Sequence, residues 1–585
     1  MCGIFGYIGS KHNAAEIVFE GLKLLDYRGY DSWGVAVKAG EKIAIEKKTG
    51  KIGENKISLP QSTLGIGHTR WATHGGVTTA NAHPHQDCTG EIAVLHNGII
   101  ENYEQLKNDL LKKNHVFLSE TDTEVIAHLV EDFLKKEDLV TSVKDTFNLL
   151  KGLSAIVVIH TKSNRIVVAK NGSPVVIGKG NNEFFVASDT AGILPYTKEV
   201  LFLKDNELIS LSDKLELYSL PGFKPLTPVF ETINWKIEQA QKGKFKHFML
   251  KEISEQPIVI KNIATTYADQ ISDLADVIKQ SRGIFFIGSG TASYACLAGV
   301  YLFSKIAKKH VNTAFASEFN YLEDFLNEES LIITLSQSGE TIDIIEPLTR
   351  ARKKGSKIMA LVNVLGSTIY RMADYKLLLG AGPEKAVAST KAYTAKISVL
   401  TMLAFALADK MEDAREILLK SAEEVERLLS PENLEKIEKI AQKLHTQEHM
   451  YVMGRGMSYA TALEGALKVK EVSYVHAEGL AGGEIKHGPI ALIDKGTPCI
   501  VLAPEDETLD AIMSNAIEIK SRGGYIIGIS SKNSPVFDSW IEVKETGLPL
   551  LTQVIPMQLL GYYLALSKNL DPDKPRNLAK SVTVK

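Results

Sequence analysis

Cys2 follows the initiator methionine directly, in the stretch Met1-Cys2-Gly3-Ile4-Phe5-Gly6. A small second residue usually allows the initiator methionine to be removed, and Cys2 would then carry both a thiol and the free α-amine of the chain. An α-amine has an unperturbed pKa of about 8, so it can serve as a base near neutral pH. A thiol beside such a base is an activated nucleophile. The alternative is that Cys2 is an ordinary residue of a buried first strand.

Three further polar stretches of the amino-terminal half contain groups that suit an amino-acid substrate: residues 68–75, 96–98 and 120–122. Their arginine, aspartate and threonine side chains can hold the α-carboxylate and α-amine of an amino acid by charge-assisted hydrogen bonds. Asn97 and the N–H of Gly98 can form an oxyanion hole. The alternative for this Asn-Gly pair is a hairpin turn.

The nearby stretch His83-Pro84-His85, together with Cys88, contains residue types that can bind a metal. This set lacks a fourth ligand and a second pair at zinc-site spacing. We therefore expect no metal and no cofactor.

The amino-terminal half resembles a class II, N-terminal-nucleophile glutamine amidotransferase domain. The matching stretches are Cys2–Gly6, Tyr27–Ser32, His68–Gly75, Asn81–His85, His96–Asn102 and Ser119–Glu124. The resemblance implies that Cys2 attacks the glutamine side-chain amide and releases ammonia, that Asn97 and Gly98 form the oxyanion hole, and that the His-Pro-His stretch holds no metal. It also implies the glutamine-binding residues Arg70, Trp71, Thr73, His74 and Asp122. Trp33 departs from the family pattern, which has alanine there, and its bulk is expected to affect the cover of the glutamine site.

In the carboxy-terminal half, the stretch Ser336-Gln337-Ser338-Gly339-Glu340-Thr341 directly follows an apolar run. Hydroxyls and consecutive N–H groups in front of a helix bind anions, and the absence of a Walker motif favours a simple phosphate over a nucleotide. The alternative is an ordinary serine-rich helix cap.

Glu464, Lys468 and Glu471 are spaced to share one face of a helix that apolar residues flank. If buried, these coupled charges suit proton transfer, and if solvated they are only a salt-bridge stripe. His487, in a loop rich in titratable groups, can move a proton near neutral pH, although an isolated histidine is more often structural. Lys580 lies in a polar tail whose composition suggests disorder, yet a desolvated lysine there can form a Schiff base.

The pattern of apolar runs divides the chain. Residues 2 to about 215 contain short strand-like runs, including 35–37, 64–67, 92–95, 155–159, 166–169 and 184–187, and two helical stretches, 14–25 and 122–135. A proline-containing stretch, 220–246, is expected to be a linker. The second half alternates strands, such as 283–288, 331–335 and 358–362, with helices, which predicts parallel sheets covered by helices. Residues 286–295 resemble residues 452–460, which indicates a duplicated domain.

These motifs together resemble a glutamine amidotransferase domain joined to two sugar-isomerase domains. The resemblance implies an α+β N-terminal-nucleophile domain with layered β-sheets flanked by helices, followed by two α/β parallel-sheet sugar-isomerase (SIS) domains. The expected bounds are 2–218 for the amidotransferase domain, 219–246 for the linker, 247–425 and 426–570 for the two sugar-isomerase domains, and 571–585 for a catalytic tail.

The resemblance also implies the reaction. Ammonia from L-glutamine is added to D-fructose 6-phosphate with ketose-to-aldose isomerisation, giving D-glucosamine 6-phosphate and L-glutamate, the first step of the hexosamine (UDP-N-acetylglucosamine) pathway. Lys580 is expected to form the imine, Glu471 to move the proton with support from Lys468 and Glu464, and His487 to open the sugar ring from a partner subunit. The implied sugar-phosphate residues are Gly290, Thr291, Ser336, Gln337, Ser338, Thr341, Val387, Ser389 and Ala579. Ala292 stands where the family commonly has a phosphate-binding serine, so contacts are expected to shift to Ser293 or to the Ser336 loop. Trp71 and the tail are expected to gate an ammonia channel.

Composition sets wider limits. The chain has 585 residues, 44% of them hydrophobic and 23% charged, with a net charge of −3, which does not suggest nucleic-acid or membrane-surface binding. Four dispersed cysteines form no disulfide framework, no signal peptide is recognised, and the apolar stretch 548–566 is interrupted by proline and glutamine. We expect a cytoplasmic homodimer.

Two alternative functions stay open beside the implied reaction. One is a non-catalytic sugar-phosphate sensor, which would not need Cys2, Glu471 or Lys580, and the other is an amidotransferase with another acceptor. A phosphoribosyl acceptor would call for a pyrophosphate loop that is not found, whereas an altered sugar stays open because of Ala292.

Overall fold

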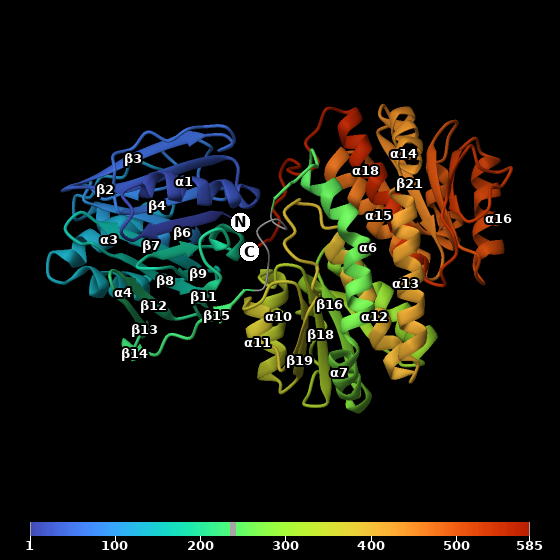
Figure 1. Cartoon of the computed structure of the whole chain (residues 1–585), viewed down its shortest axis with the longest axis horizontal. Helices are drawn as coiled ribbons and strands as arrows, with labels where there is room; N and C mark the ends of the chain where they lie inside the picture. Colours follow the sequence, from blue (N-terminus) through green and yellow to red (C-terminus); the bar gives the residue numbers. More distant parts are fainter. Residues whose placement is uncertain (1, 234–240, 584–585) are drawn as a thin grey trace. The chain divides into compact units, whose positions relative to one another are not determined.

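The computed structural model describes residues 2–233 and 241–583. Contacts within the chain divide it into two compact units, which are described separately (Figure 1). The first runs to Gln241 and also includes the chain from Ala579 onward, and the second is Lys242–Leu578. Met1, part of the expected linker (234–240) and the end of the expected tail (584–585) lie outside the described residues.

The first unit contains two antiparallel sheets. In spatial order, the strands of the larger sheet are β15 (Glu231–Thr232), β11 (Glu199–Phe202), β9 (Val176–Lys179), β10 (Phe184–Ala187), β1 (Gly3–Ile8), β4 (Leu64–Arg70), β2 (Ser32–Ala39) and β3 (Lys42–Thr49). Those of the smaller sheet are β14 (Lys224–Leu226), β13 (Leu215–Ser219), β12 (Glu207–Leu211), β8 (Ile166–Asn171), β7 (Ser154–His160), β6 (Ile92–Gly98) and β5 (His85–Gln86). All six strand-like runs expected from the sequence lie in these strands.

The two sheets pack face to face with helices outside them. One apolar cluster joins their inner faces, with Ile4 and Ile66 from one sheet meeting Leu95 and Val157 from the other. The outer face of the larger sheet packs against α1 (Ala14–Leu24), and that of the smaller sheet against α3 (Glu124–Leu134) and α4 (Leu139–Leu149). The layered α+β fold predicted for this half is confirmed.

The helices of this unit were only partly foreseen. The predicted stretches 14–25 and 122–135 correspond to α1 and α3, whereas α2 (Tyr103–Leu111) and α4 were not predicted. Asp138 marks the start of α4, since its carboxylate accepts the N–H groups of Val140 and Thr141. The described part of this unit also contains a 3₁₀ turn, η1 (Asp26–Arg28), and the short α5 (Thr190–Ile193). The stretch expected to be a linker begins with the edge strands β14 and β15, so its first residues belong to the sheets.

The second unit contains two parallel five-stranded sheets with the same strand order. The first sheet is β17 (Asn312–Phe315), β16 (Gly283–Gly288), β18 (Ser330–Ser336), β19 (Lys357–Val362) and β20 (Tyr375–Leu378). The second is β22 (His476–Ala481), β21 (His449–Gly454), β23 (Pro498–Ala503), β24 (Tyr525–Ser530) and β25 (Ser539–Glu542). In both, the first strand in sequence lies between the second and the third, so the direction in which successive strands are added to the sheet reverses there while all strands stay parallel. Ligands of open parallel sheets bind at this switch point, outside the carboxyl ends of the strands.

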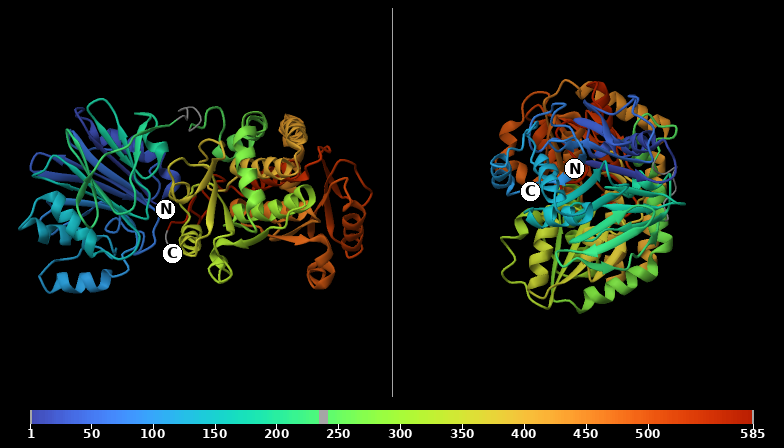
Figure 2. Two further views of the ribbon diagram at one scale, coloured as in Figure 1. Left: turned by 90° about the horizontal axis from the view of Figure 1, so that it is seen from below. Right: turned by 90° about the vertical axis from the view of Figure 1, so that its left-hand side faces the viewer.

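Helices cover both faces of these sheets (Figure 2). They are α6 (Phe248–Thr266), α7 (Ala268–Gln280), α8 (Thr291–Leu302), α9 (Ala316–Phe319), α10 (Ile342–Lys353), α11 (Thr368–Met372), α12 (Lys391–Leu407), α13 (Met411–Leu428), α14 (Pro431–Leu444), α15 (Met457–Ser473), α16 (Leu509–Lys520), α17 (Pro549–Thr552) and α18 (Val554–Ser567), with shorter turns η3 (Phe303–Ala307), η4 (Gly482–His487) and η5 (Pro489–Leu492).

The duplication extends to single residues. Gly290, before α8, has φ 55° and ψ −128°, and Gly456, before α15, has φ 53° and ψ −129°. This left-handed conformation favours glycine. The two copies therefore share the turn that leads from the first strand into the first helix, as the sequence repeat predicted.

One helical segment in the described part of the chain, Pro549–Ser567, is long and apolar enough to cross a membrane by length and composition alone. In the second unit, 89% of its most apolar window is buried. This matches the expectation that the stretch 548–566 is a core helix.

Candidate active sites

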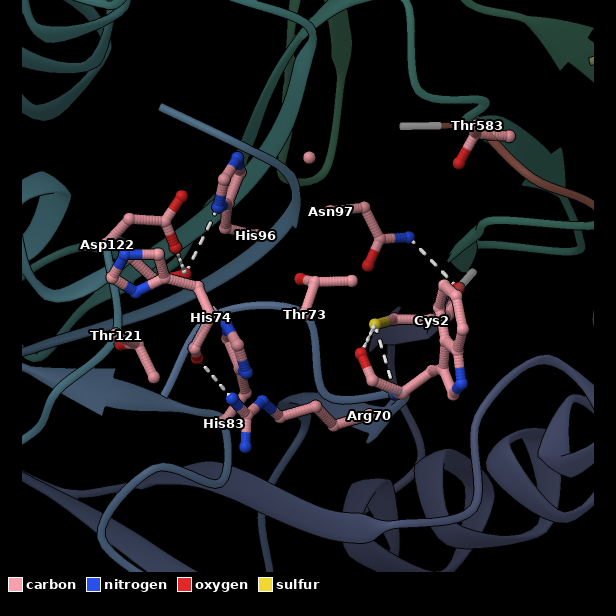
Figure 3. Close-up of a pocket in the computed structure, with 13 residues that line it drawn as sticks. Cys2, Arg70, Thr73, His74, His83, His96, Asn97, Thr121, Asp122 and Thr583 are labelled. Carbon is pink, nitrogen blue, oxygen red and sulfur yellow. Dashed lines mark hydrogen bonds between the residues drawn. The ribbon is translucent and has the colours of Figure 1, made fainter. Parts of the chain in front are cut away.

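The Cys2 thiol lies beside the backbone of Trp71 in the first unit (Figure 3). The Trp71 N–H donates to Sγ at 3.3 Å, and the thiol faces the Trp71 carbonyl at 3.5 Å. The Cys2 carbonyl accepts hydrogen bonds from Asn97 Nδ2 at 3.1 Å and from Arg28 Nε at 3.4 Å. These contacts fix the backbone on both sides of the thiol.

A pocket opens at this thiol. Its lining contains every residue expected at the glutamine site and some that were not expected: Cys2, Arg70, Trp71, Thr73, His74, His83, His96, Asn97, Gly98, Thr121, Asp122, Thr123 and Thr583. Cys2 is partly exposed. The alternative that Cys2 is only a buried strand residue therefore fails.

Asn97 and Gly98 form the end of β6. They pair with Ala155 and Ser154 of β7, so the hairpin-turn alternative is wrong. Gly98 has φ 138°, and a Cβ there would lie 2.0 Å from the carbonyl oxygen of Leu153, so only glycine fits. Besides the hydrogen that Asn97 Nδ2 donates to Cys2, its amide carries a second hydrogen suited to an oxyanion.

His68 orients Asn97 from behind. Its Nε2 lies 3.0 Å from Asn97 Oδ1, and complete burial lowers the pKa of His68 to about 3, so the ring is neutral. Because Nδ2 of Asn97 donates to Cys2, Oδ1 is the acceptor, and His68 carries its proton on Nε2. The sequence contained His68 within a matching motif but gave no signal of this role.

The guanidinium of Arg70 organises the loop that covers the pocket. It donates to the carbonyls of His74 at 2.5 Å, Gly75 at 3.0 Å and Gly76 at 3.0 Å. An arginine has five N–H donors, so two are left for a carboxylate. Asp122 accepts the Ile100 N–H through Oδ2 at 2.8 Å and presents the rest of its carboxylate to the pocket.

The histidines weighed as metal ligands bind hydroxyls instead. His83 Nε2 lies 3.0 Å from Thr123 Oγ1, and His85 Nε2 lies 3.1 Å from Thr121 Oγ1. Burial lowers the pKa of both imidazoles, that of His85 to about 3. Cys88 lies in a different cluster, so these three residues do not form one site.

Three further residues of this unit, Trp33, Thr583 and Arg28, lie differently from what the sequence suggested. Trp33 is buried, and its ring packs edge-on against Phe19 of α1 at 5.2 Å, so it is not part of the pocket lining. Thr583, far away in sequence, does line the pocket. Arg28 was also missed as a contact of Cys2; it forms a buried ion pair with Asp189 at 2.9 Å.

The candidate phosphate site in the second unit is the loop between β18 and α10. The Gly339 N–H donates to Ser336 Oγ at 3.0 Å and the Glu340 N–H to Ser338 Oγ at 3.2 Å, while Glu340 Oε1 accepts the Thr368 N–H at 2.9 Å. Thr341 precedes α10 without capping it through its side chain. The serine hydroxyls thus accept backbone N–H groups of this loop, as the serine-rich cap alternative expects, while the N-terminus of α10 favours an anion.

The equivalent loop of the second copy is filled with carboxylates. Glu505, Asp506 and Glu507 occupy it, and Asp506 Oδ1 accepts the N–H of Thr508 at 2.8 Å and its hydroxyl at 2.6 Å. This negative charge in front of α16 disfavours phosphate. The two copies therefore share a fold but differ in their suitability for a sugar phosphate.

The predicted charged face of α15 is buried at its centre. Lys468 Nζ lies 2.5 Å from Glu471 Oε2, 3.4 Å from Glu464 Oε1 and 2.8 Å from Thr291 Oγ1. Glu464 and Lys468 are fully buried, whereas Glu471 is 21% exposed. Burial raises the pKa of Glu464 to about 7. Burial opposes the Lys468 charge, but the adjacent carboxylates raise its pKa. A solvated stripe is excluded.

The loop before α8 offers fewer free hydroxyls for phosphate binding than the sequence suggested. The Thr291 hydroxyl donates to Glu464 Oε1 at 3.3 Å and accepts from Lys468, so it belongs to the α15 network. Ala292 has no hydroxyl, and Ser293 donates its own to the Gly290 carbonyl at 2.6 Å. Of the two expected replacements for the missing serine, the Ser336 loop is favoured.

Two buried carboxylates shape the loop of Val387 and Ser389. Glu384 accepts the Ser389 hydroxyl at 2.9 Å and the Thr390 N–H at 3.0 Å. The second carboxylate is that of Glu252, which accepts the Ala386 N–H through Oε1 at 3.2 Å. The N–H of Val387 donates to the Asp573 carbonyl at 3.0 Å. Val387 and Ser389 are expected from the sequence, whereas Glu384 has no sequence signal of its own.

The remaining residues expected at the sugar site are Gln337, His487, Ala579 and Lys580. Gln337 accepts the Asn363 N–H through its carbonyl at 3.2 Å. His487 ends η4 and is exposed. Ala579 and Lys580 belong to the first unit, and their assignment to a sugar site remains a prediction.

Comparison with known proteins agrees with both units. Residues 68–195 match a glutamine amidotransferase domain model, and residues 277–406 and 443–567 match the SIS domain model. The full chain is 44% identical to the full-length glutamine–fructose-6-phosphate aminotransferase (isomerizing) of Thermococcus kodakarensis and 43% identical to that of Aquifex aeolicus. The C-terminal domain of glucosamine-fructose-6-phosphate aminotransferase from Francisella tularensis matches 57% of this chain and 99% of its own, with 32% identity and a TM-score of 0.52. The chain belongs to the glutamine–fructose-6-phosphate aminotransferase (isomerizing) family.

Proposed function

We propose that this enzyme converts D-fructose 6-phosphate and L-glutamine into D-glucosamine 6-phosphate and L-glutamate. The observation that carries the proposal is that one chain combines a cysteine pocket bearing oxyanion donors with a phosphate loop and a buried proton-transfer network. The family relatives carry the same pair of reactions in their names.

Cys2 supplies the nucleophile in the glutamine half-reaction. After removal of Met1, the α-amine takes the thiol proton and Sγ attacks the side-chain amide carbon of glutamine. The second N–H of Asn97 and the N–H of Gly98 stabilise the oxyanion, and Arg70 and Asp122 hold the ends of the amino acid. Trp71, Thr73 and His74 complete the binding site. Collapse of the intermediate releases ammonia, and water then hydrolyses the thioester to glutamate.

The sugar half-reaction uses the second unit together with Lys580. Ser336, Gln337, Ser338 and Thr341 bind the phosphate, while Gly290, Thr291, Val387, Ser389 and Ala579 shape the sugar site. His487 from a partner subunit opens the ring. The Lys580 amine condenses with the C2 carbonyl and releases water.

Ammonia then replaces Lys580 at C2. Glu471 removes a proton from C1 and a proton is returned to C2, so that the ketose imine becomes an aldose amine. Lys468 and Glu464 support this transfer, because the ammonium shares its charge with both carboxylates. Trp71 and the tail gate the passage of ammonia, which bulk water would otherwise dilute and protonate.

We further propose a cytoplasmic homodimer that acts in the hexosamine pathway and has no nucleic-acid or membrane partner. The exposure of His487 supports a role at a partner subunit, and the near-neutral net charge of −3 supports a small-molecule enzyme.

The decisive experiment is a product assay with glutamine and a panel of ketose phosphates. Amino-sugar phosphate formed preferentially from fructose 6-phosphate supports the proposal. Preference for another ketose would point to an altered acceptor, and binding of sugar phosphate without any turnover would favour a sensor.

A further inference from the structure

Four potential metal ligands converge in the first unit, on the side chains of Cys88, His115, His128 and Glu131. Cys88 lies between β5 and β6, and His115 lies between α2 and α3. His128 and Glu131 are one turn apart on α3. Their ligand atoms all lie within 4.8 Å of one another, although they come from three separate segments.

Five of the six distances between these four atoms are close to the edges of a small tetrahedron. The two Nδ1 atoms of His115 and His128 are 3.3 Å apart, and Cys88 Sγ lies 3.7 and 3.5 Å from them. Glu131 Oε2 lies 3.1 Å from His115 Nδ1 and 3.5 Å from His128 Nδ1. Zinc bonds of about 2.0–2.1 Å to nitrogen and oxygen and about 2.3 Å to sulfur give tetrahedral edges of about 3.3–3.6 Å.

The outer nitrogens of both imidazoles face carboxylates. His115 Nε2 lies 3.0 Å from Asp132 Oδ1, and His128 Nε2 lies 3.6 Å from Glu124 Oε1. At His115 the Asp132 carboxylate is within hydrogen-bond distance, so it holds the ring proton on Nε2 and leaves the lone pair of Nδ1 pointing inward, as in the outer shell of protein metal sites. The Glu124 carboxylate lies farther from His128 Nε2 and favours the same arrangement through its negative charge. The two Nδ1 lone pairs, the Glu131 carboxylate and the Cys88 sulfur are all electron-rich, so they repel one another at these distances. A cation at their centre would attract all four.

Backbone N–H groups further suit Cys88 to a metal. The Val116 N–H donates to Cys88 Sγ at 3.4 Å, and the Cys88 N–H donates to Glu131 Oε2 at 3.3 Å. The Val116 N–H favours the thiolate, although partial burial raises the pKa of the Cys88 thiol overall, so a bound cation would displace the thiol proton. Cys88 is exposed, whereas both histidines are buried, so an ion can reach the cluster from the cysteine side.

We propose that Cys88, His115, His128 and Glu131 bind one structural Zn²⁺. Imidazole and thiolate select zinc over magnesium or calcium, and four protein ligands leave no position for a substrate. Binding transfers the thiol proton of Cys88 to solvent. The proposed site replaces the expectation of no metal in this chain, and it combines Cys88 with His115 and His128 instead of with His83 and His85.

The ion would hold together the segments that carry the glutamine pocket. Glu124, which faces His128, also accepts the N–H groups of Leu118 and Ser119, both at 2.7 Å. The pocket residues Thr121–Thr123 lie between those contacts and α3. Zinc therefore stabilises this part of the unit while lying outside the Cys2 pocket.

Elemental analysis of the full-length protein, purified from zinc-supplemented cultures and dialysed, tests the site. We expect about one zinc per chain in the wild type. The double variant Cys88→Ser/His115→Ala should lose the zinc, because two of its four ligands are removed. Both changes lie in loops, so α3 stays intact and the variant is expected to fold. Cys2→Ala and His12→Gln are matched controls for the other reactive thiol and for an exposed histidine of the same unit, and both should retain the metal.

Cobalt substitution and chelation give independent measurements. Co²⁺ added to metal-free wild type should produce tetrahedral ligand-field bands and a thiolate charge-transfer band that Cys88→Ser abolishes and Cys2→Ala preserves. Zinc should raise the melting temperature of chelated wild type, so the test stands even if the double variant does not fold. Wild type with neither bound metal nor a zinc-dependent melting temperature would overturn the proposal, as would metal lost on Cys2→Ala. Another metal lost with Cys88→Ser would overturn the assignment to zinc.

Discussion

Nε2 of His68 lies 3.0 Å from Oδ1 of Asn97, and this contact orients the amide that faces the oxyanion. Because the buried ring is neutral, it contributes a hydrogen bond without adding charge to the pocket. His68 is therefore a positioning residue.

Replacing His68 by leucine should lower kcat for glutamine hydrolysis by about 10-fold or more with a smaller effect on KM, since an oxyanion donor loses its orientation. Steady-state glutaminase assays check this, with a melting curve to confirm folding. His68→Gln, whose amide can donate to Asn97, should recover part of the rate. A leucine variant with unchanged kcat would show that Asn97 holds its orientation unaided.

Cys2→Ala should abolish glutamine hydrolysis and glutamine-dependent synthesis but leave isomerisation of fructose 6-phosphate, because the sugar chemistry uses other residues. Parallel assays of glutamate and glucose 6-phosphate separate the two reactions. Intact-mass analysis of active wild type should show that Met1 is absent, and retention of Met1 would remove the α-amine from the mechanism.

The phosphate loop can be tested by exchanging residues between the two copies. Ser338→Glu introduces the residue type that Glu505 provides in the second copy, and should raise KM for fructose 6-phosphate about 10- to 100-fold through lost hydrogen bonds to a charged group. Glu505→Ser, the opposite change in the second copy, should leave that KM near the wild-type value. Equal effects of both variants would contradict the assignment of phosphate to the first copy.

Buried Glu464 should make stability depend on pH. Its pKa is raised in the folded protein to about 7, so the folded state binds more protons than the unfolded state between about pH 4.5 and pH 7. The stability that Glu464 contributes is therefore present at low pH and is lost as pH rises through about 7. The change is on the order of 3 kcal/mol at about 1.4 kcal/mol per pKa unit.

Glu464→Gln removes this titration, so calorimetry should show its stability relative to wild type rising from pH 5 to pH 8. Glu412→Gln, at an exposed position of α13, is the control and should follow wild type throughout. A pH-independent difference between Glu464→Gln and wild type would mean that Glu464 is ionised over the whole range.

Lys580→Ala should eliminate amino-sugar synthesis and retain glutamine hydrolysis, because only the sugar half-reaction needs the imine. Borohydride added with fructose 6-phosphate should reduce that imine and leave a sugar adduct on Lys580, found by peptide mass spectrometry. Lys574→Ala, in the same tail, is the control. Full synthesis by Lys580→Ala would rule out the Schiff-base assignment.

Much of this architecture follows from local patterns. Short apolar runs bounded by turn residues predict the buried strands, because this pattern is visible within a few consecutive residues. The internal repeat predicts the duplicated domain. The edge strands β14 and β15 were missed because such short elements rely on packing against the rest of the unit. The helix α4 is as long as α1 and α3, but its valines and threonines have low helix propensity, so its sequence signal is weak.

The candidate sites show the same division. Cys2, Arg70 and Ser336 lie in short motifs that sequence alone can reveal. His68 behind Asn97, Thr583 in the Cys2 pocket and the cluster of Cys88 with His115 and His128 depend on convergence of distant segments. The burial of Glu464 and Lys468 was undecidable from their spacing, because a solvated helix has the same periodicity.

The carboxylates of residues 505–507 also matter for inhibitor design. A compound built around a phosphate mimic for the Ser336 loop would meet repulsion at the matching position of the second copy. Inhibition should therefore follow binding at one site per chain, even though the chain contains the same fold twice.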